Sequence, residues 1–147
     1  MKIYIDNCVY NRPFDDFRKQ ERIFLEAMSF YMILVWIEQG RIETVHSDAL
    51  EYEKDHILDP ERKLRIERYF SMASEYINIS DDTIKRAEEL KEIGLKDMDA
   101  LHVALAEESD AEYFVTCDDF IIKCGRQNKD KINSHRWNNR IYWRYDI

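Results

Sequence analysis

Cysteine, proline and glycine are scarce in this chain, and each scarcity excludes a class of protein. The 147 residues contain three Gly, two Pro and three Cys, with 45% hydrophobic residues. So little Gly and Pro argues against a disordered or fibrous chain. The odd number of cysteines (Cys8, Cys117 and Cys124), without a C-x-x-C pair, favours neither a disulfide framework nor a zinc site. We therefore expect a globular fold held together by its own core, in the reducing cytoplasm.

Long apolar runs and an excess of basic residues are also absent. The apolar run from Tyr31 to Ile37 is too short to span a bilayer, and residues 1–6 lack the apolar stretch of a signal peptide. There are 30 Asp and Glu against 22 Lys and Arg, so the net charge is −8. We expect no membrane partner and no general coating of nucleic acid. An enzyme acting on a phosphodiester is not excluded, because bound divalent cations reverse the field at an acidic site.

The hydrophobic pattern alternates between short apolar segments and longer segments with helical periodicity, which indicate strands and helices respectively. The predicted strands cover residues 2–5, 42–45, 76–79 and 113–116. The predicted helices cover residues 17–39, Ser47 to the break at Pro60, 61–75, Ser80 to Gly94, 97–108 and 120–124. Strands that alternate with helices form a parallel sheet with helices on both faces. We expect a single α/β domain over residues 1–147.

The first long helix is expected to begin at about Phe17. Asp15 or Asp16 is its expected N-cap, because the preceding stretch has turn character. Four apolar residues then recur at helical spacing: Phe24, Met28, Tyr31 and Val35. Gly40 is expected to end the helix as its C′ residue.

Four carboxylates stand where a parallel sheet places its functional groups. Asp6 ends the first predicted strand and Asp118 follows the last, while Glu53 lies in the second turn of one helix and Asp99 in the first turn of another. Ligands of such sheets bind beyond the carboxyl ends of the strands. Converging carboxylates repel one another unless a cation lies between them, and oxygen ligands favour Mg²⁺ or Mn²⁺ over zinc. The chain has 30 acidic residues, however, so solvated acids in loops fit this pattern equally well.

Four local sequences resemble the PIN-domain family, in the family's order. They are Lys2-Ile3-Tyr4-Ile5-Asp6-Asn7, Ser47-Asp48-Ala49-Leu50-Glu51-Tyr52-Glu53, Asp99-Ala100-Leu101-His102-Val103-Ala104 and Val115-Thr116-Cys117-Asp118-Asp119-Phe120. The resemblance covers residues 1–125. Residues 7–16 further resemble a prokaryotic subgroup with an N-R-P-F turn after the first strand.

This resemblance implies a three-layer α/β/α fold with a small, mainly parallel sheet. It implies a metal-dependent endoribonuclease that uses Mg²⁺ or Mn²⁺, with Asp6, Glu53, Asp99 and Asp118 as the catalytic and metal-binding residues. Many small prokaryotic members are toxins of toxin–antitoxin pairs, and dimers are common. RNA, an antitoxin protein and a second copy of the chain are therefore the expected partners. The site could hold one metal ion or two.

The last residues depart from the family pattern. Residues 126–147 match nothing in it and are rich in Asn, Arg, Trp and Tyr. Interleaved bases and aromatic rings suit single-stranded RNA. A dimer contact or an ordinary edge strand fits them equally well.

Several neighbours of the four acids have both a functional and a structural interpretation. Thr116 could place its hydroxyl beside the metal or serve as a strand residue, and Asn7 could bind a phosphate or shape a turn. Arg12 could contact a phosphate or lie at the surface. His102 could support the acids from behind or pack as an ordinary helical residue.

For other neighbours we favour the structural interpretation. Asp97 and Asp119 are expected as helix caps, and Cys8 and Cys117 as small buried residues. Glu51 is two positions from Glu53 and must therefore point to a different face of its helix.

Two other functions compete with the nuclease. A PIN-like domain that no longer cleaves could serve as a binding or assembly module, but the presence of all four acids favours the nuclease. A receiver-type domain also places acids at strand ends. It needs an adjacent acid pair, which Asp6-Asn7 does not supply.

Overall fold

The computed structural model describes residues 1–132, and its core is a sheet of four parallel strands in the order β3-β2-β1-β4. The strands are β1 (Lys2–Ile5), β2 (Glu43–Ser47), β3 (Glu75–Ile77) and β4 (Tyr113–Val115). Tyr4 stands at the centre of the sheet, opposite Val45 on one side and Phe114 on the other. All three are fully buried, and the Tyr4 and Phe114 rings stack at 5.7 Å. Most of residues 126–147, for which the sequence suggested RNA binding, a dimer contact or an edge strand, lie outside the described range.

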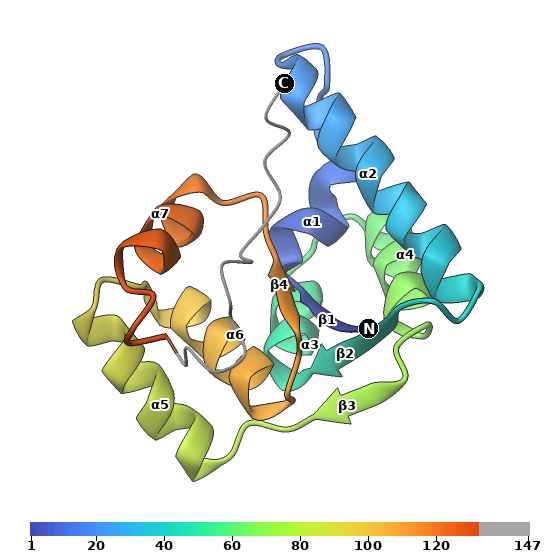
Figure 1. Ribbon diagram of the computed structural model, residues 1–147. Coiled ribbons are helices and arrows are strands. Elements are labelled where there is room, and N and C mark those ends of the chain that lie inside the picture. Colours follow the sequence, from blue (N-terminus) through green and yellow to red (C-terminus); the bar gives the residue numbers. More distant parts are fainter. Residues whose placement is uncertain (133–147) are drawn as a thin grey trace.

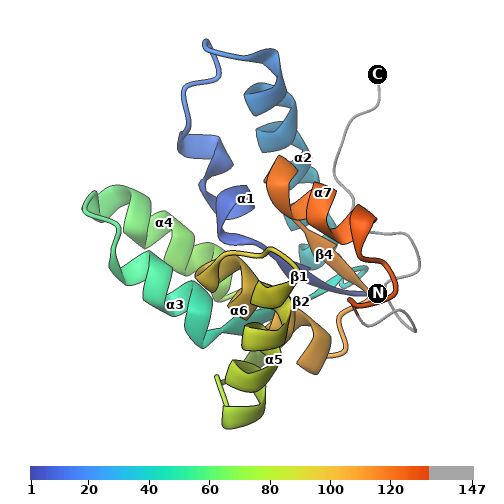
Figure 2. The same cartoon turned by 90° about the vertical axis from the view of Figure 1, so that its left-hand side faces the viewer.

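Helices cover both faces of this sheet, so the expected three-layer α/β/α class is confirmed (Figure 1). The helices are α1 (Asn7–Asn11), α2 (Glu21–Glu38), α3 (Asp48–Asp55), α4 (Pro60–Phe70), α5 (Asp81–Glu92), α6 (Asp97–Glu108) and α7 (Asp119–Gln127). In Figure 1, α2 and α4 lie to the right of the sheet, and α5, α6 and α7 to the left. Figure 2 shows α3 beside α4, and α3 also contacts α6, so it joins the two sides. Within residues 1–132 no helix combines the length and the apolar character that crossing a membrane requires.

Local capping explains several helix starts that the sequence predicts. The Ser47 hydroxyl accepts a hydrogen bond from the Leu50 amide, and Ser80 forms a capping box with Thr83. At the other end of α2, Gly40 has φ +68°, the left-handed conformation that glycine adopts without strain. The predicted C′ residue is therefore confirmed.

The predicted start of the long helix is wrong. Within residues 11–16, which were expected to form a turn, Arg12–Phe14 fold as a 3₁₀ helix directly after α1, and α2 begins only at Glu21. Pro13 suits the start of the 3₁₀ helix, because its missing N–H has no partner to lose there. Asp16 accepts a hydrogen bond from the Arg18 amide instead of capping α2, and Gln20 stands at the N-cap.

The four apolar residues that mark α2 in the sequence lie on its exposed face. Phe24, Met28, Tyr31 and Val35 are 41–48% exposed, while Ala27, Phe30 and Ile33 are buried. Apolar residues surround most of this helix, so periodicity alone cannot separate the face that enters the core from the face that does not. The exposed face leaves an apolar stripe on the surface.

Candidate functional site

The sheet topology gathers the sequence-predicted acids at one edge. Asp6 directly follows β1, and its amide donates to the Val115 carbonyl at the end of β4 (2.9 Å). Asp118 follows β4, which is the neighbour of β1. Glu53 lies on α3, which leaves the end of β2, and Asp99 lies in the first turn of α6. This is the carboxyl edge, where parallel sheets carry their ligand sites.

Thr116 links the first and last of these acids. Its hydroxyl donates to Asp6 Oδ2 (2.7 Å) and accepts a hydrogen bond from the Asp118 amide (3.0 Å). The Cys8 thiol also donates to Asp6 Oδ2 (3.2 Å). Asp6 is only 5% exposed, and these donors fix the orientation of its carboxylate. Thr116 thus lies beside the acids, as one of its two interpretations expects.

Asp118 is itself a helix cap. Its Oδ1 accepts hydrogen bonds from the amides of Phe120 (2.8 Å) and Ile121 at the start of α7. Asp119, the expected cap, is instead the first residue of the helix and forms an ion pair with Arg22 (2.7 Å). Asp97 is likewise not the N-cap of α6, because Lys96 stands there.

The pKa of Asp99 reflects the repulsion between the carboxylates of the cluster. Burial, together with the negative charges of Asp6 and Asp118, raises the pKa of Asp99 to about 6. Three carboxylates from three different elements therefore act on one another electrostatically.

Glu53 is linked to this cluster through His102, which also feels the charges of Asp6 and Asp99, and Glu51 is not. Glu51 binds His46 (2.6 Å) and Lys54 (2.5 Å), away from the cluster, as the spacing of the two acids predicts. Glu53 Oε1 lies 3.3 Å from His102 Nε2, and Glu53 Oε2 is buried without a hydrogen-bond partner.

His102 is buried behind Glu53, in contact with a residue that sequence reasoning missed. Its Nδ1 lies 2.7 Å from the Tyr4 hydroxyl, which also lies 2.7 Å from Ser47 Oγ. Burial alone would lower the pKa of His102, but the negative charges of Glu53, Asp6 and Asp99 outweigh it, and the pKa is raised. The one signal for Tyr4 in the sequence is a hydroxyl in a fully buried strand, which needs a partner.

Two other supporting residues make contacts that do not include the acids. Asn7 Oδ1 accepts a hydrogen bond from Asn11 Nδ2 (2.9 Å), a contact within α1. Arg12 forms ion pairs with Asp15 (3.1 Å) and with the buried Glu26 (2.6 Å). Arg12 is largely buried and not the surface residue of its structural interpretation, and Asn7 begins α1 in place of shaping a turn.

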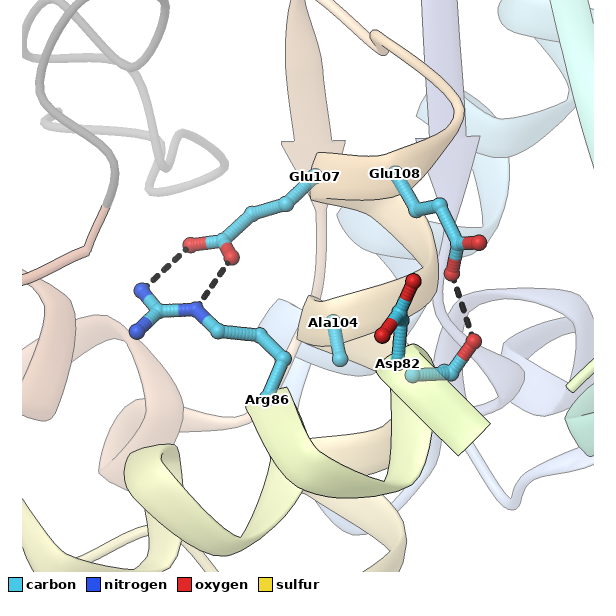
Figure 3. Close-up of a pocket in the computed structure, with 6 residues that line it drawn as sticks. Asp82, Arg86, Ala104, Glu107 and Glu108 are labelled. Atoms are coloured by element: carbon cyan, nitrogen blue, oxygen red, sulfur yellow. Dashed lines mark hydrogen bonds and ion pairs between the residues drawn. The ribbon is translucent and has the colours of Figure 1, made fainter. Parts of the chain in front are cut away.

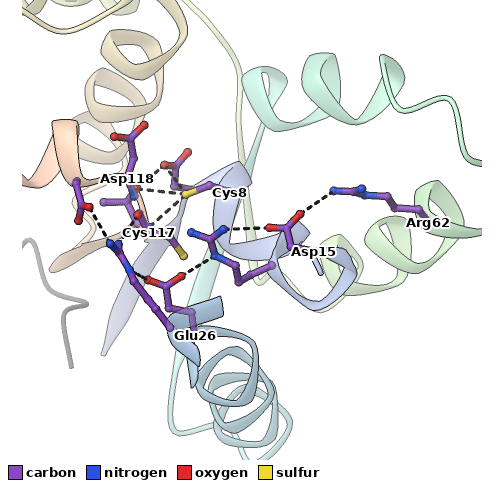
Figure 4. A network of polar contacts seen from close by, with 11 residues as sticks. Cys8, Asp15, Glu26, Arg62, Cys117 and Asp118 are labelled. Carbon is purple, nitrogen blue, oxygen red and sulfur yellow. Dashed lines mark hydrogen bonds and ion pairs between the residues drawn. The ribbon is translucent and has the colours of Figure 1, made fainter. Parts of the chain in front are cut away.

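The Arg12 contacts belong to a network that ends at the acid cluster. Glu26 also binds Arg22 (2.6 Å), whose guanidinium donates to the Cys117 carbonyl (2.9 Å). Figure 4 shows the network running from Asp118 and Cys117 through Glu26 to Asp15. It braces the loop that carries Asp118 against α2.

A pocket of ≈ 270 Å³ lies at the other end of α6 (Figure 3). Two of its three carboxylates already have partners, since Glu107 binds Arg86 (2.7 Å) and Glu108 binds Thr83 (2.5 Å). Glu107 is eight residues from Asp99, which corresponds to about 12 Å along a helix. This pocket is separate from the acid cluster.

The donor set of the cluster fits a hard divalent cation. In residues 1–132, no three acids, histidines or cysteines converge closely enough to hold a metal ion as they stand. The four predicted acids nevertheless offer only oxygen atoms, the ligands of Mg²⁺ and Mn²⁺. The unpartnered Glu53 Oε2 and the raised pKa of Asp99 both mark places where a cation would relieve an unfavourable interaction.

Comparison with protein families identifies the class. The family model of the PIN domain matches residues 9–125, and the chain belongs to this family. The match begins three residues after Asp6, so it includes Glu53, Asp99 and Asp118 only. A comparison with curated proteins finds no match. PIN domains are typically nucleases that use divalent metal ions, most often Mg²⁺ or Mn²⁺.

Proposed function

We propose that this PIN domain is a metal-dependent endoribonuclease whose site is formed by Asp6, Glu53, Asp99 and Asp118. The observation that carries the proposal is the convergence of Asp6 and Asp118, at two neighbouring strand ends and linked through Thr116, with Asp99 of α6. Burial and the charges of Asp6 and Asp118 raise the pKa of Asp99, in agreement with this arrangement. Carboxylates that repel one another in this way are costly to the fold, and a cation-dependent function accounts for their presence.

Each carboxylate has a distinct support in the site. Thr116 orients Asp6, and the start of α7 orients Asp118 through its amides. Asp99 and Glu53 approach from α6 and α3. Together these four would hold Mg²⁺ or Mn²⁺. When bound, such an ion supplies an activated water and neutralises the charge that develops on a phosphoryl group.

A PIN-like module that no longer cleaves is the alternative. It needs none of the four acids, and removing them would relieve the repulsion at Asp99. The presence of all four at one edge of the sheet therefore supports cleavage.

RNA cleavage tests the proposal. We expect the protein to cut a mixture of single-stranded RNAs with Mn²⁺ and to stop when EDTA is added. Asp6→Asn should abolish cutting, because Asn keeps the shape of Asp and removes its charge. The matched control is Asp97→Asn, an exposed acid at the start of α6, which should cut like the wild type. Equal cutting by Asp6→Asn and Asp97→Asn would contradict the proposal.

We also propose a second copy of the chain as a partner, bound through the apolar stripe of α2. The stripe consists of Phe17, whose ring packs edge-on against Phe24, and five side chains of α2: Phe24, Met28, Tyr31, Met32 and Val35. All six are 41–50% exposed. The spacing 24, 28, 31, 35 reads the same in both directions. An antiparallel copy would therefore place Phe24 against Val35 and Met28 against Tyr31, as a two-fold axis requires. Six side chains make a small patch, at the low end of what a specific interface needs.

The role of a toxin with an antitoxin partner rests on the resemblance to small prokaryotic members. A small reading frame directly upstream that encodes an antitoxin-like protein would support it. A cytoplasmic location is likewise a proposal, and the three free thiols at Cys8, Cys117 and Cys124 agree with a reducing compartment.

A further inference from the structure

A chain of three buried polar side chains lies directly behind Glu53. Ser47, Tyr4 and His102 are 0%, 0% and 1% exposed. They come from the end of β2, from β1 and from α6, and two contacts of 2.7 Å join them through the Tyr4 hydroxyl. The chain ends at His102 Nε2, which lies 3.3 Å from Glu53 Oε1. Burying three polar groups is costly unless each is hydrogen-bonded, so an apolar core would be the simpler solution here.

The hydrogen-bond directions along this chain determine which proton His102 presents. The Ser47 oxygen accepts from the Leu50 amide, which leaves its own hydrogen free to be donated to Tyr4. The Tyr4 hydroxyl can then donate to Nδ1 of His102, and the ring proton lies on Nε2. If Nδ1 instead donates to the Tyr4 oxygen, the ring carries a proton on Nε2 only when both nitrogens are protonated. A neutral ring with its proton on Nδ1 would point the Nε2 lone pair at the Glu53 carboxylate, and repulsion between the two excludes this state.

We infer that His102, oriented by Tyr4 and Ser47, is a positioning residue that holds Glu53 toward the acid cluster. The inference rests on the proposed function, since Glu53 is one of the four proposed metal ligands. Glu53 Oε1 faces His102 Nε2 in an ion-pair contact of 3.3 Å that falls short of hydrogen-bond geometry, so Nε2 is buried without a hydrogen-bond partner. The second oxygen, Oε2, is likewise buried without one. Oε2 is therefore the atom left to bind the cation. Outer partners of this kind are commonly worth 10–100-fold in metal affinity.

Tyr4→Phe is the most direct test. It keeps the ring stacked on Phe114 and removes only the hydroxyl that orients His102. We expect Mn²⁺ to bind about tenfold more weakly, as measured by calorimetric titration. Tyr10→Phe is the matched control, because Tyr10 is an equally buried tyrosine packed edge-on against Phe30 and Phe70. It should bind Mn²⁺ like the wild type. An unchanged affinity in Tyr4→Phe would overturn the inference.

A double-variant cycle separates positioning from a general effect on the fold. If Tyr4 acts through Glu53, Tyr4→Phe should cost no further Mn²⁺ affinity once Glu53→Gln is present. A merely structural role predicts the same loss in both backgrounds, and that result would contradict the inference. His102→Gln, which retains a donor, should bind Mn²⁺ more tightly than His102→Leu.

The outcomes also distinguish the inference from the function on which it rests. If the wild type and Glu53→Gln differ in Mn²⁺ affinity but Tyr4→Phe does not, the inference fails and the proposed function stands. If the wild type binds no Mn²⁺ and cuts no RNA, both fail.

Discussion

Asp99 lies in an environment that is unfavourable for a charged carboxylate. Its pKa is raised from 3.8 to about 6, so the folded state resists its ionisation. For a carboxyl group with a raised pKa, the cost to stability is absent at low pH and complete above the folded pKa. Without metal, ionisation of Asp99 should therefore destabilise the protein progressively between about pH 4 and pH 6.

Asp99→Asn should remove this cost. At pH 8 we expect the variant to be more stable than the wild type by on the order of 2 kcal/mol. At pH 4 the variant and the wild type should unfold at the same urea concentration. Urea unfolding at both pH values, with EDTA present, measures the difference. A variant that is less stable than the wild type at pH 8 would contradict the account of Asp99.

Sequence reasoning singled out Asp99 and named His102 as one possible support of the acids, but it missed the hydrogen bonds that join His102 to Tyr4 and Ser47. Asp99 is marked by a local pattern at the start of a helix. The contact between Tyr4 and His102 joins residues 98 positions apart, and only the packing of β1 against α6 brings them together. Thr116 was only half predicted, because threonine is as common in a strand as it is useful beside a metal site.

Among the elements, α2 was predicted least well. The C-terminal end of α2 is determined by a local signal, because Gly40 adopts the left-handed conformation there, and the sequence alone predicts it. Its beginning depends on Arg12 and Glu26, whose ion pair joins the 3₁₀ helix to α2. Helix starts at Ser47 and Ser80 were predictable because each cap is satisfied within four residues. The ion pair between Arg12 and Glu26 is non-local by comparison, and hydrophobic periodicity does not predict such a contact.

Glu26 should be the residue that holds α2 to the loop carrying Asp118. It is buried between Arg12 and Arg22, so removing its charge leaves two guanidinium groups without their partner. We expect Glu26→Gln to lower the free energy of unfolding by about 2 kcal/mol. Glu61→Gln is the control, an exposed glutamate in α4 whose loss should cost about 0.5 kcal/mol or less. Equal stabilities of the two variants in urea unfolding would contradict this role.

For the whole molecule, the apolar stripe of α2 predicts weak self-association. The patch is small, so the dimer should dissociate on dilution, which sedimentation velocity over a concentration series measures. Met28→Glu, at the centre of the stripe, should give a monomer throughout. The control is Leu58→Glu, an exposed apolar residue before α4, which should dimerise like the wild type. A wild type that is monomeric at every concentration would exclude the second copy and leave a different protein as the occupant of the stripe.

Calorimetric titration of Mn²⁺ tests most directly whether the four carboxylates hold a divalent cation. The wild type should bind Mn²⁺, and Asp6→Asn and Asp99→Asn should each bind about tenfold more weakly or not at all, because each loses a full negative charge from the site. Asp97→Asn, next to the site in sequence but exposed and paired with Lys91, should bind like the wild type. If Asp6→Asn and Asp99→Asn both bind Mn²⁺ as tightly as the wild type, these carboxylates do not hold the cation and the central claim is wrong.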